Sequence, residues 1–129
     1  MNIKELQTVC HKAAHDNGWW DTAFLLEEQI GMTYVDEIIS LVLQDAVIDK
    51  KAAKYALMHS ELSEGLEGVR KPGPSDKIPA YTIEEEELAD TIIRILDYAG
   101  RYDLRISEAI VAKLEFNKTR GHKHGGKKL

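Results

Sequence analysis

Two short segments carry the same pattern: Glu61-Leu62-Ser63-Glu64 and, further along the chain, Glu87-Leu88-Ala89-Asp90. In each segment two carboxylates stand three residues apart within a helical apolar pattern, so a helix would place both on one face within a turn of each other. Like charges at this spacing destabilise a helix by roughly 0.2–0.5 kcal/mol unless a cation or solvent compensates them. Two such helices side by side would bring four carboxylates together.

Apolar residues flank both acidic pairs, which indicates that the carboxylates lie close to core-facing stripes. Carboxylates near a core need a partner. Mg²⁺ suits them because it takes oxygen ligands, keeps several waters and is commonly shared with substrate phosphates. The alternative interpretation is that all four carboxylates are ordinary charges on solvated helix faces. The flanking residues are Leu57, Leu62, Leu66 and Val69 around the first pair and Leu88, Ile92, Ile95 and Leu96 after the start of the second.

Length and composition predict one soluble domain over residues 1–129. The hydrophobic fraction is 43% and the charged fraction 30%, which is typical of a globular protein. The sequence contains no apolar run near the ~20 residues that span a bilayer, and the first residues do not resemble a secretory signal. A single cysteine, Cys10, fits a reducing cytoplasm and a small core residue. We therefore expect a cytoplasmic protein with no membrane partner.

The net charge of −5 is unevenly distributed. Five of the 17 basic residues lie in residues 118–129, which contain no acid, so the rest of the chain carries 12 basic against 22 acidic residues. An acidic body argues against binding a nucleic acid polymer, which needs a broad basic face. Residues 121–129 are expected to form a flexible basic tail suited to a small polyanion.

The N-terminal part of the chain predicts a helix over residues 2–16 that ends at Asn17-Gly18. His11 and His15 stand four residues apart, but the glutamate of a zinc-protease motif is missing, so we expect surface histidines. Trp19-Trp20 follows the break, and we expect one ring in the core and the other free to stack on a flat ligand.

The middle of the chain predicts a short helix and a longer one, divided at Gly31 to Thr33. The segment 35–47 is apolar nearly all round, which indicates a helix buried by another subunit. A further helix is expected over residues 51–70, and the loop that follows Pro72 leads to a capping box of Thr82 and Glu85.

The C-terminal part predicts that Gly100 closes the preceding helix and that Ser107 caps the last one, with Ile106 and Val111 as a hydrophobic staple. The last helix carries Lys113, Asn117 and Arg120 as a polar stripe, a set of donors that could bind phosphate oxygens.

The order of these features resembles the MazG-like, all-α nucleoside triphosphate pyrophosphatases. The resemblance covers residues 51–123 and rests on ExxE within Ala56 to Glu67, a Pro/Gly loop, ExxD within Glu86 to Ile95, and the basic close from Lys113; residues 17–20 look like the family's entry segment. It implies an all-α helical bundle assembled as a homodimer or homotetramer. It also implies hydrolysis of a (deoxy)nucleoside triphosphate to the monophosphate and pyrophosphate, for control or cleaning of the nucleotide pool.

The resemblance further implies a set of site residues. Mg²⁺, or Mn²⁺ in its place, would be held by Glu61, Glu64, Glu87 and Asp90, with Glu61 as the base that activates water. Lys113, Asn117, Arg120 and Lys123 would bind the triphosphate, and Trp20 would stack on the base. Many members carry a further glutamate where this chain has Ser60, so the number of metal ions stays open.

Three alternatives accompany this expectation. A phosphoribosyl-ATP pyrophosphohydrolase shares the family's fold and acidic motifs. A non-catalytic helical oligomer would use the carboxylates structurally or leave them in solvent. A di-iron carboxylate bundle needs Glu-x-x-His pairs, whereas the third residue after Glu61 is Glu64 and after Glu87 is Asp90.

Overall fold

The structure is a computed structural model that describes residues 1–30 and 37–119. These residues form five helices and no β-strand, so the expected all-α fold is confirmed for them: α1 (Ile3–Asp16), α2 (Asp21–Ile30), α3 (Glu37–Arg70), α4 (Ile83–Arg101) and α5 (Ile106–Lys118). None of the helices in these ranges is both long enough and apolar enough to cross a membrane.

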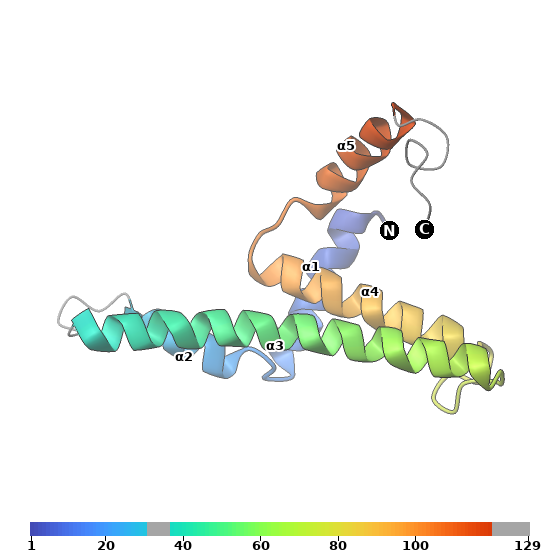
Figure 1. The fold of residues 1–129 in the computed structure, drawn as a ribbon, viewed down its shortest axis with the longest axis horizontal. Helices are drawn as coiled ribbons and strands as arrows, with labels where there is room; N and C mark the ends of the chain where they lie inside the picture. Colours follow the sequence, from blue (N-terminus) through green and yellow to red (C-terminus); the bar gives the residue numbers. More distant parts are fainter. Residues whose placement is uncertain (31–36, 120–129) are drawn as a thin grey trace, which may run out of the picture.

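Helix α3 forms the long axis of the molecule, and α4 and α2 pack along it (Figure 1). Its 34 residues span about 50 Å at about 1.5 Å per residue. The expectation of two helices, one ending near residue 48 and one starting at residue 51, was wrong. Residues 48–51 contain no glycine or proline, so nothing interrupts the backbone hydrogen bonds there. The expected break at Gly31 to Thr33 lies outside the described residues.

The remaining helices pack around α3 in a fixed order. Helix α4 lies along the C-terminal half of α3, α1 packs on α4, and α2 packs on α3. Helix α5 packs against α1 and extends away from the α3–α4 pair (Figure 1), and it contains no buried residue.

The helix ends follow the sequence in some places and not in others. The Thr82 capping box is confirmed: its hydroxyl accepts from Glu85 N at 3.2 Å, and the Glu85 carboxylate accepts from Thr82 N at 2.7 Å. The Ser107 cap is wrong, because α5 begins at Ile106 after Arg105, which makes no side-chain cap hydrogen bond. Gly100 likewise does not end α4, which continues to Arg101.

Gly100 is instead the point where α4 approaches α1. A Cβ placed on Gly100 would lie 2.4 Å from Cβ of His11 and 3.1 Å from the carbonyl oxygen of Gln7. Gly68 has the same role between α3 and α4, since a Cβ there would lie 2.9 Å from Cγ2 of Ile83 and 3.0 Å from the Glu84 backbone nitrogen. Both glycines therefore serve helix packing.

The core lies where α1, α2, α3 and α4 meet. It contains Trp20, Ala23, Met58 and Tyr98, and Cys10 is buried close by as expected. The apolar residues expected to face a core beside the acidic pairs are mostly exposed: Leu62 is 47%, Leu66 51%, Leu88 47% and Ile92 52% exposed. The α3–α4 contact thus buries carboxylates and leaves leucine and isoleucine outside.

Candidate metal centre

Three of the four predicted carboxylates meet between α3 and α4. Glu61, Glu87 and Asp90 each offer an oxygen, and these oxygens lie within 4.8 Å of one another. Glu61 is 6% and Glu87 5% exposed, and Asp90 is half-buried. For these residues the interpretation as charges on a solvated helix face is therefore wrong. Their convergence follows from the i, i+3 spacing on α4 and from the close approach of the two helices at Gly65 and Gly68.

Glu87 is in the least favourable environment of the three. Burial, a hydrogen bond with the Glu61 side chain and the nearby charge of Glu64 together raise its pKa from 4.5 to about 7. Its Oε2 atom is buried and has no hydrogen-bond partner among the described residues. A buried carboxylate oxygen without a partner is costly, and a bound cation would provide one.

Glu64 stands beside this cluster rather than in it. Its side chain is exposed and accepts a hydrogen bond from Ser60 Oγ at 3.4 Å. Its charge still contributes to the raised pKa of Glu87. Glu64 is therefore close enough to Glu87 for its charge to act on that carboxylate.

The donor set and its dimensions fit a hard divalent cation. Mg²⁺ binds oxygens at about 2.0–2.1 Å in an octahedron, which puts opposite ligands about 4.2 Å apart. The three carboxylate oxygens lie within 4.8 Å, so small side-chain movements would close them around the ion. The residues offer no imidazole or thiolate, which favours Mg²⁺ or Mn²⁺ over zinc.

Two basic residues that the sequence did not single out contact the acidic residues. Arg94 Nε donates to Glu61 Oε1 at 2.5 Å, and Lys77 Nζ lies 2.7 Å from Glu86 Oε1. Arg94 lies four residues after Asp90, on the same face of α4, which is the only sequence signal for it. Lys77 comes from the loop and had no signal.

Glu86 lies in the first turn of α4, where the helix dipole favours negative charge, and it also has specific partners. Its side chain is buried, and hydrogen bonds from Lys77 and Ser75 lower its pKa. Ser75 is itself 2% exposed and accepts from the backbone N–H groups of Lys77 and Ile78 at 3.1 and 2.9 Å. This loop therefore anchors the start of α4, one residue before Glu87.

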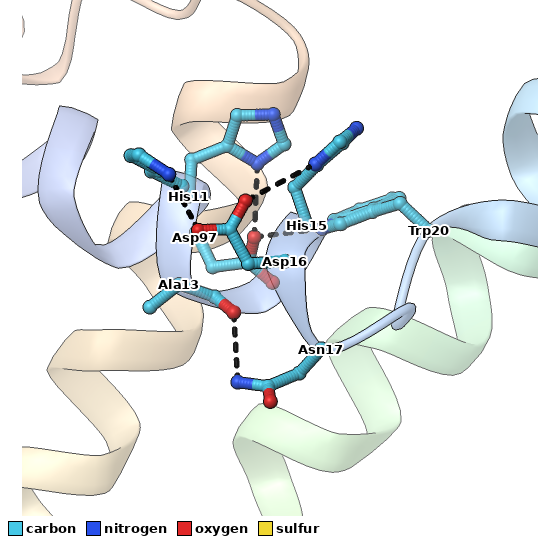
Figure 2. A network of polar contacts seen from close by, with 8 residues as sticks. His11, Ala13, His15, Asp16, Asn17, Trp20 and Asp97 are labelled. Atoms are coloured by element: carbon cyan, nitrogen blue, oxygen red, sulfur yellow. Dashed lines mark hydrogen bonds and ion pairs between the residues drawn. The ribbon is translucent and has the colours of Figure 1, made fainter.

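The base-stacking role expected for Trp20 is wrong in this structure. Trp20 is 1% exposed, and its Nε1 donates to Asp97 Oδ1 at 2.7 Å; His11 Nδ1 lies 3.1 Å from the same oxygen (Figure 2). The two tryptophans divide as expected, but Trp19 is the exposed ring, at 59%. His11 is half-buried against Trp20, so of the two histidines only His15 is on the surface.

Of the predicted triphosphate-binding residues, Lys113 and Asn117 are not brought to the cluster within one chain. Lys113 and Asn117 are exposed on α5, which extends away from the α3–α4 pair (Figure 1). Arg120, Lys123 and the tail at 121–129 lie outside the described residues.

The carboxylates lie between two hollows. One, of about 490 Å³, is bounded by α1, α3 and α4 and includes Asp90 and Arg94 in its lining. The other, of about 510 Å³, is bounded by α3 and α4; Glu64 and Glu87 line it together with Lys71 and the hydroxyl residues Ser60 and Ser63. No residue of α5 lines either hollow. The first is mainly apolar, and the second is lined by more polar and charged residues.

Comparison with known proteins adds no relative: no family model, no curated protein and no solved structure matches the chain.

Proposed function

We propose that this protein is a Mg²⁺-dependent nucleoside triphosphate pyrophosphohydrolase, which releases a nucleoside monophosphate and pyrophosphate. The observation that carries the proposal is the cluster of Glu61, Glu87 and Asp90, with a buried Glu87 oxygen that has no partner among the described residues. The four-carboxylate motif and its resemblance to the MazG-like pyrophosphatases select this activity among metal-dependent reactions. Mn²⁺ is expected to substitute for Mg²⁺.

The chemistry requires water to attack the α-phosphorus while the bond to the bridging oxygen breaks and pyrophosphate leaves. Bound Mg²⁺ would neutralise charge on the phosphate oxygens. Glu61, Glu64, Glu87 and Asp90 would hold the ion, and Glu61 would also take the proton of the water. Arg94 holds one oxygen of Glu61 and so fixes the direction of that carboxylate.

The polar hollow beside Glu87 would take the leaving pyrophosphate. Lys71 supplies a cation there, and Ser60 and Ser63 supply hydroxyl groups. These groups do not match the charge of a triphosphate. We propose that Lys113 and Asn117 of a second copy, with Arg120 and Lys123, complete the phosphate site in a homodimer or homotetramer.

The exposed apolar faces support this assembly. Leu62, Leu66 and Ile92 lie on the outer faces of the helices that carry the carboxylates, and each is about half exposed. On α5, Val111 is 61% and Leu114 56% exposed. Exposed leucine, isoleucine and valine side chains on these helices favour an interface, and a second copy would cover the face around the acidic cluster and place its own α5 there.

The test is pyrophosphate release from a panel of standard and modified nucleoside triphosphates with Mg²⁺, for the wild type and for Glu64→Gln, Asp90→Asn and Glu84→Gln. Glu84 is an exposed acid in the first turn of α4, so Glu84→Gln is a control for loss of one negative charge. We expect the wild type and Glu84→Gln to release pyrophosphate. The two site variants should lose at least about a hundredfold while keeping their helical content, as for removal of a charge-stabilising group.

Other results would select the alternatives. If only phosphoribosyl-ATP is hydrolysed, the protein is a phosphoribosyl-ATP pyrophosphohydrolase. If no substrate is turned over but Mg²⁺ still stabilises the fold and Asp90→Asn removes that stabilisation, the protein is a non-catalytic metal-binding oligomer. Specific activity that falls on dilution, in parallel with dissociation measured by light scattering, would support the shared site.

A further inference from the structure

The apolar hollow joins the candidate metal centre to a surface that the proposed chemistry does not use. Its volume of about 490 Å³ lies in the range of about 300–1,000 Å³ typical of small-molecule sites. Asp90 belongs both to this cavity and to the carboxylate cluster. A molecule whose phosphate sits at the carboxylates would therefore have its remaining part beside this cavity.

The α1 wall of the cavity is apolar, and the α4 wall carries polar groups beside Ile93. Helix α1 contributes Leu6, Val9 and Cys10, which offer only aliphatic carbon and a thiol. Helix α4 contributes Asp90, Arg94 and Asp97, which share one helix face at spacings of four and three residues. Such an arrangement suits a flat ring that has one apolar edge and one edge with hydrogen-bonding groups.

Asp97 has an acceptor to spare on this polar wall. Its Oδ1 atom takes the hydrogen bond from Trp20 Nε1 and the contact with His11 Nδ1 (Figure 2), which fixes the carboxylate in place. In the part of the chain that the structure describes, no hydrogen bond ends on Asp97 Oδ2, although Asp97 lines the cavity. A carboxylate that is held in place at the wall of a cavity favours a ligand that brings an N–H or O–H donor.

Trp19 supplies an aromatic surface at the same cavity. It lines the cavity and is 59% exposed, so its ring borders the opening. Lys54 holds this residue in position: its Nζ donates to the Trp19 carbonyl oxygen at 3.4 Å, lies 5.8 Å from the centre of the Trp19 ring and lies 3.9 Å from that of Trp20. An exposed tryptophan beside a cavity is a stacking surface for a flat ring.

We propose that this cavity binds the nucleoside part of the substrate, with the base against Trp19 and with Asp97 Oδ2 accepting a hydrogen bond from a base N–H. The choice of a nucleoside as ligand rests on the proposed function. Asp97 is then a specificity-determining residue, because a carboxylate accepts from base amino and ring N–H groups and repels base carbonyl oxygens.

The test uses nucleosides without phosphate and without metal, so that binding is measured apart from hydrolysis. The chain has only two tryptophans and Trp20 is buried, so a ring that stacks on Trp19 should quench fluorescence. We expect nucleosides to quench the tryptophan fluorescence and ribose 5-phosphate to leave it unchanged. A nucleoside methylated at its N–H edge should bind much more weakly.

Affinities of the variants are measured by equilibrium dialysis. Trp19→Leu and Asp97→Asn should each weaken nucleoside binding by about tenfold or more, since one stacking contact or one hydrogen bond to a charged acceptor is lost. Tyr81→Leu and Asp49→Asn, at exposed positions outside the cavity, should bind as the wild type does. Trp19→Leu changes an exposed residue, so it keeps the test valid even if Asp97→Asn unfolds.

The inference is overturned if nucleosides do not bind, if ribose 5-phosphate binds equally well, or if Trp19→Leu binds nucleosides as the wild type does. Failure of the proposed function has a different signature: nucleosides bind and respond to the variants, but no triphosphate is hydrolysed. Hydrolysis with an unchanged KM in both Trp19→Leu and Asp97→Asn would leave the proposed function standing and refute the cavity as its nucleoside site.

Discussion

Replacing Glu87 by glutamine should stabilise the metal-free protein above neutral pH. Glu87 is 5% exposed, its pKa is raised to about 7 and its Oε2 has no partner among the described residues. Folding therefore favours the protonated side chain, and above pH 7 the protein must bury a negative charge next to Glu61 and Glu64. Glutamine has a similar shape and no charge, so Glu87→Gln removes this cost.

The sign and size of this change in stability follow from the linkage between proton binding and folding. Between the unfolded pKa of 4.5 and the folded pKa of about 7, the folded state binds more protons than the unfolded state, so its stability falls as pH rises. The stabilisation by protonation is fully present below 4.5 and is lost above about 7. At about 1.4 kcal/mol per pH unit the upper limit is about 3.5 kcal/mol, and screening by water in the adjoining hollow reduces it to about 1–2 kcal/mol.

Mg²⁺ should reverse the effect, because it binds the charged form of the site. At a concentration one hundred times its Kd, a ligand of the folded state adds about 2.7 kcal/mol. The wild type should gain this stability near pH 8 and much less near pH 5, where Glu87 is protonated. Glu87→Gln should gain little at either pH.

Urea unfolding followed by circular dichroism measures these differences at about pH 5 and about pH 8, with EDTA or with Mg²⁺. Glu84→Gln removes an exposed charge from the same helix and controls for the helix dipole. If Glu87→Gln is less stable than the wild type in EDTA near pH 8, the Glu87 carboxylate has another stabilising partner and the argument for a cation partner fails.

Three further predictions concern packing and acid sensitivity. Gly68→Ala should lower the free energy of unfolding by about 1–3 kcal/mol, because its Cβ would meet Ile83 Cγ2 at 2.9 Å. Gly65→Ala should raise it by about 0.5–1 kcal/mol, because its Cβ would meet only Glu87 Cβ at 3.5 Å. Equal urea midpoints for the two variants would contradict this prediction. Gly100→Ala should cost about 2 kcal/mol or more, since α1 must move away from α4, and an unchanged melting temperature would refute that. Lys77→Gln should make the protein unfold at higher pH in an acid titration. Lys77 lowers the pKa of Glu86, and the stability that this carboxylate contributes is lost as pH falls through its folded pKa. An unchanged acid midpoint would show that Ser75 alone keeps Glu86 charged.

Local patterns in the sequence predicted the presence of helices well and the boundaries between them poorly. Helical periodicity gave the all-α class, and the Thr82 and Glu85 pattern gave the start of α4. The continuity of α3 was missed because charged residues at positions 49–51 look like a boundary, although they are compatible with a helix. Gly100 was taken for a helix end because its real cause, the approach of His11, is a contact between distant parts of the chain.

The carboxylate cluster was partly predictable, because part of it follows from local helix geometry. The i, i+3 spacing places two carboxylates on one helix face whatever the tertiary structure, so Glu87 and Asp90 were found together. Pairing across helices was not predictable: Arg94 with Glu61 and Trp20 with Asp97 depend on the relative rotation of α1, α3 and α4. Adjacent tryptophans likewise do not reveal which ring faces the core.

Among the described residues, the groups that meet at the candidate metal centre are mainly acidic, which supports the proposal that a second copy completes the site. Four carboxylates face or adjoin the cluster, and Arg94 is the ion-pair partner that the described residues provide to Glu61. A triphosphate would add further negative charge. The predicted cations at Lys113 and beyond lie on or after α5, whose apolar residues are exposed. The helices that bury the carboxylates also expose leucine and isoleucine around them. A second copy that covers this face would also bring its basic helix to the carboxylates. We therefore expect that a change which prevents assembly also abolishes activity.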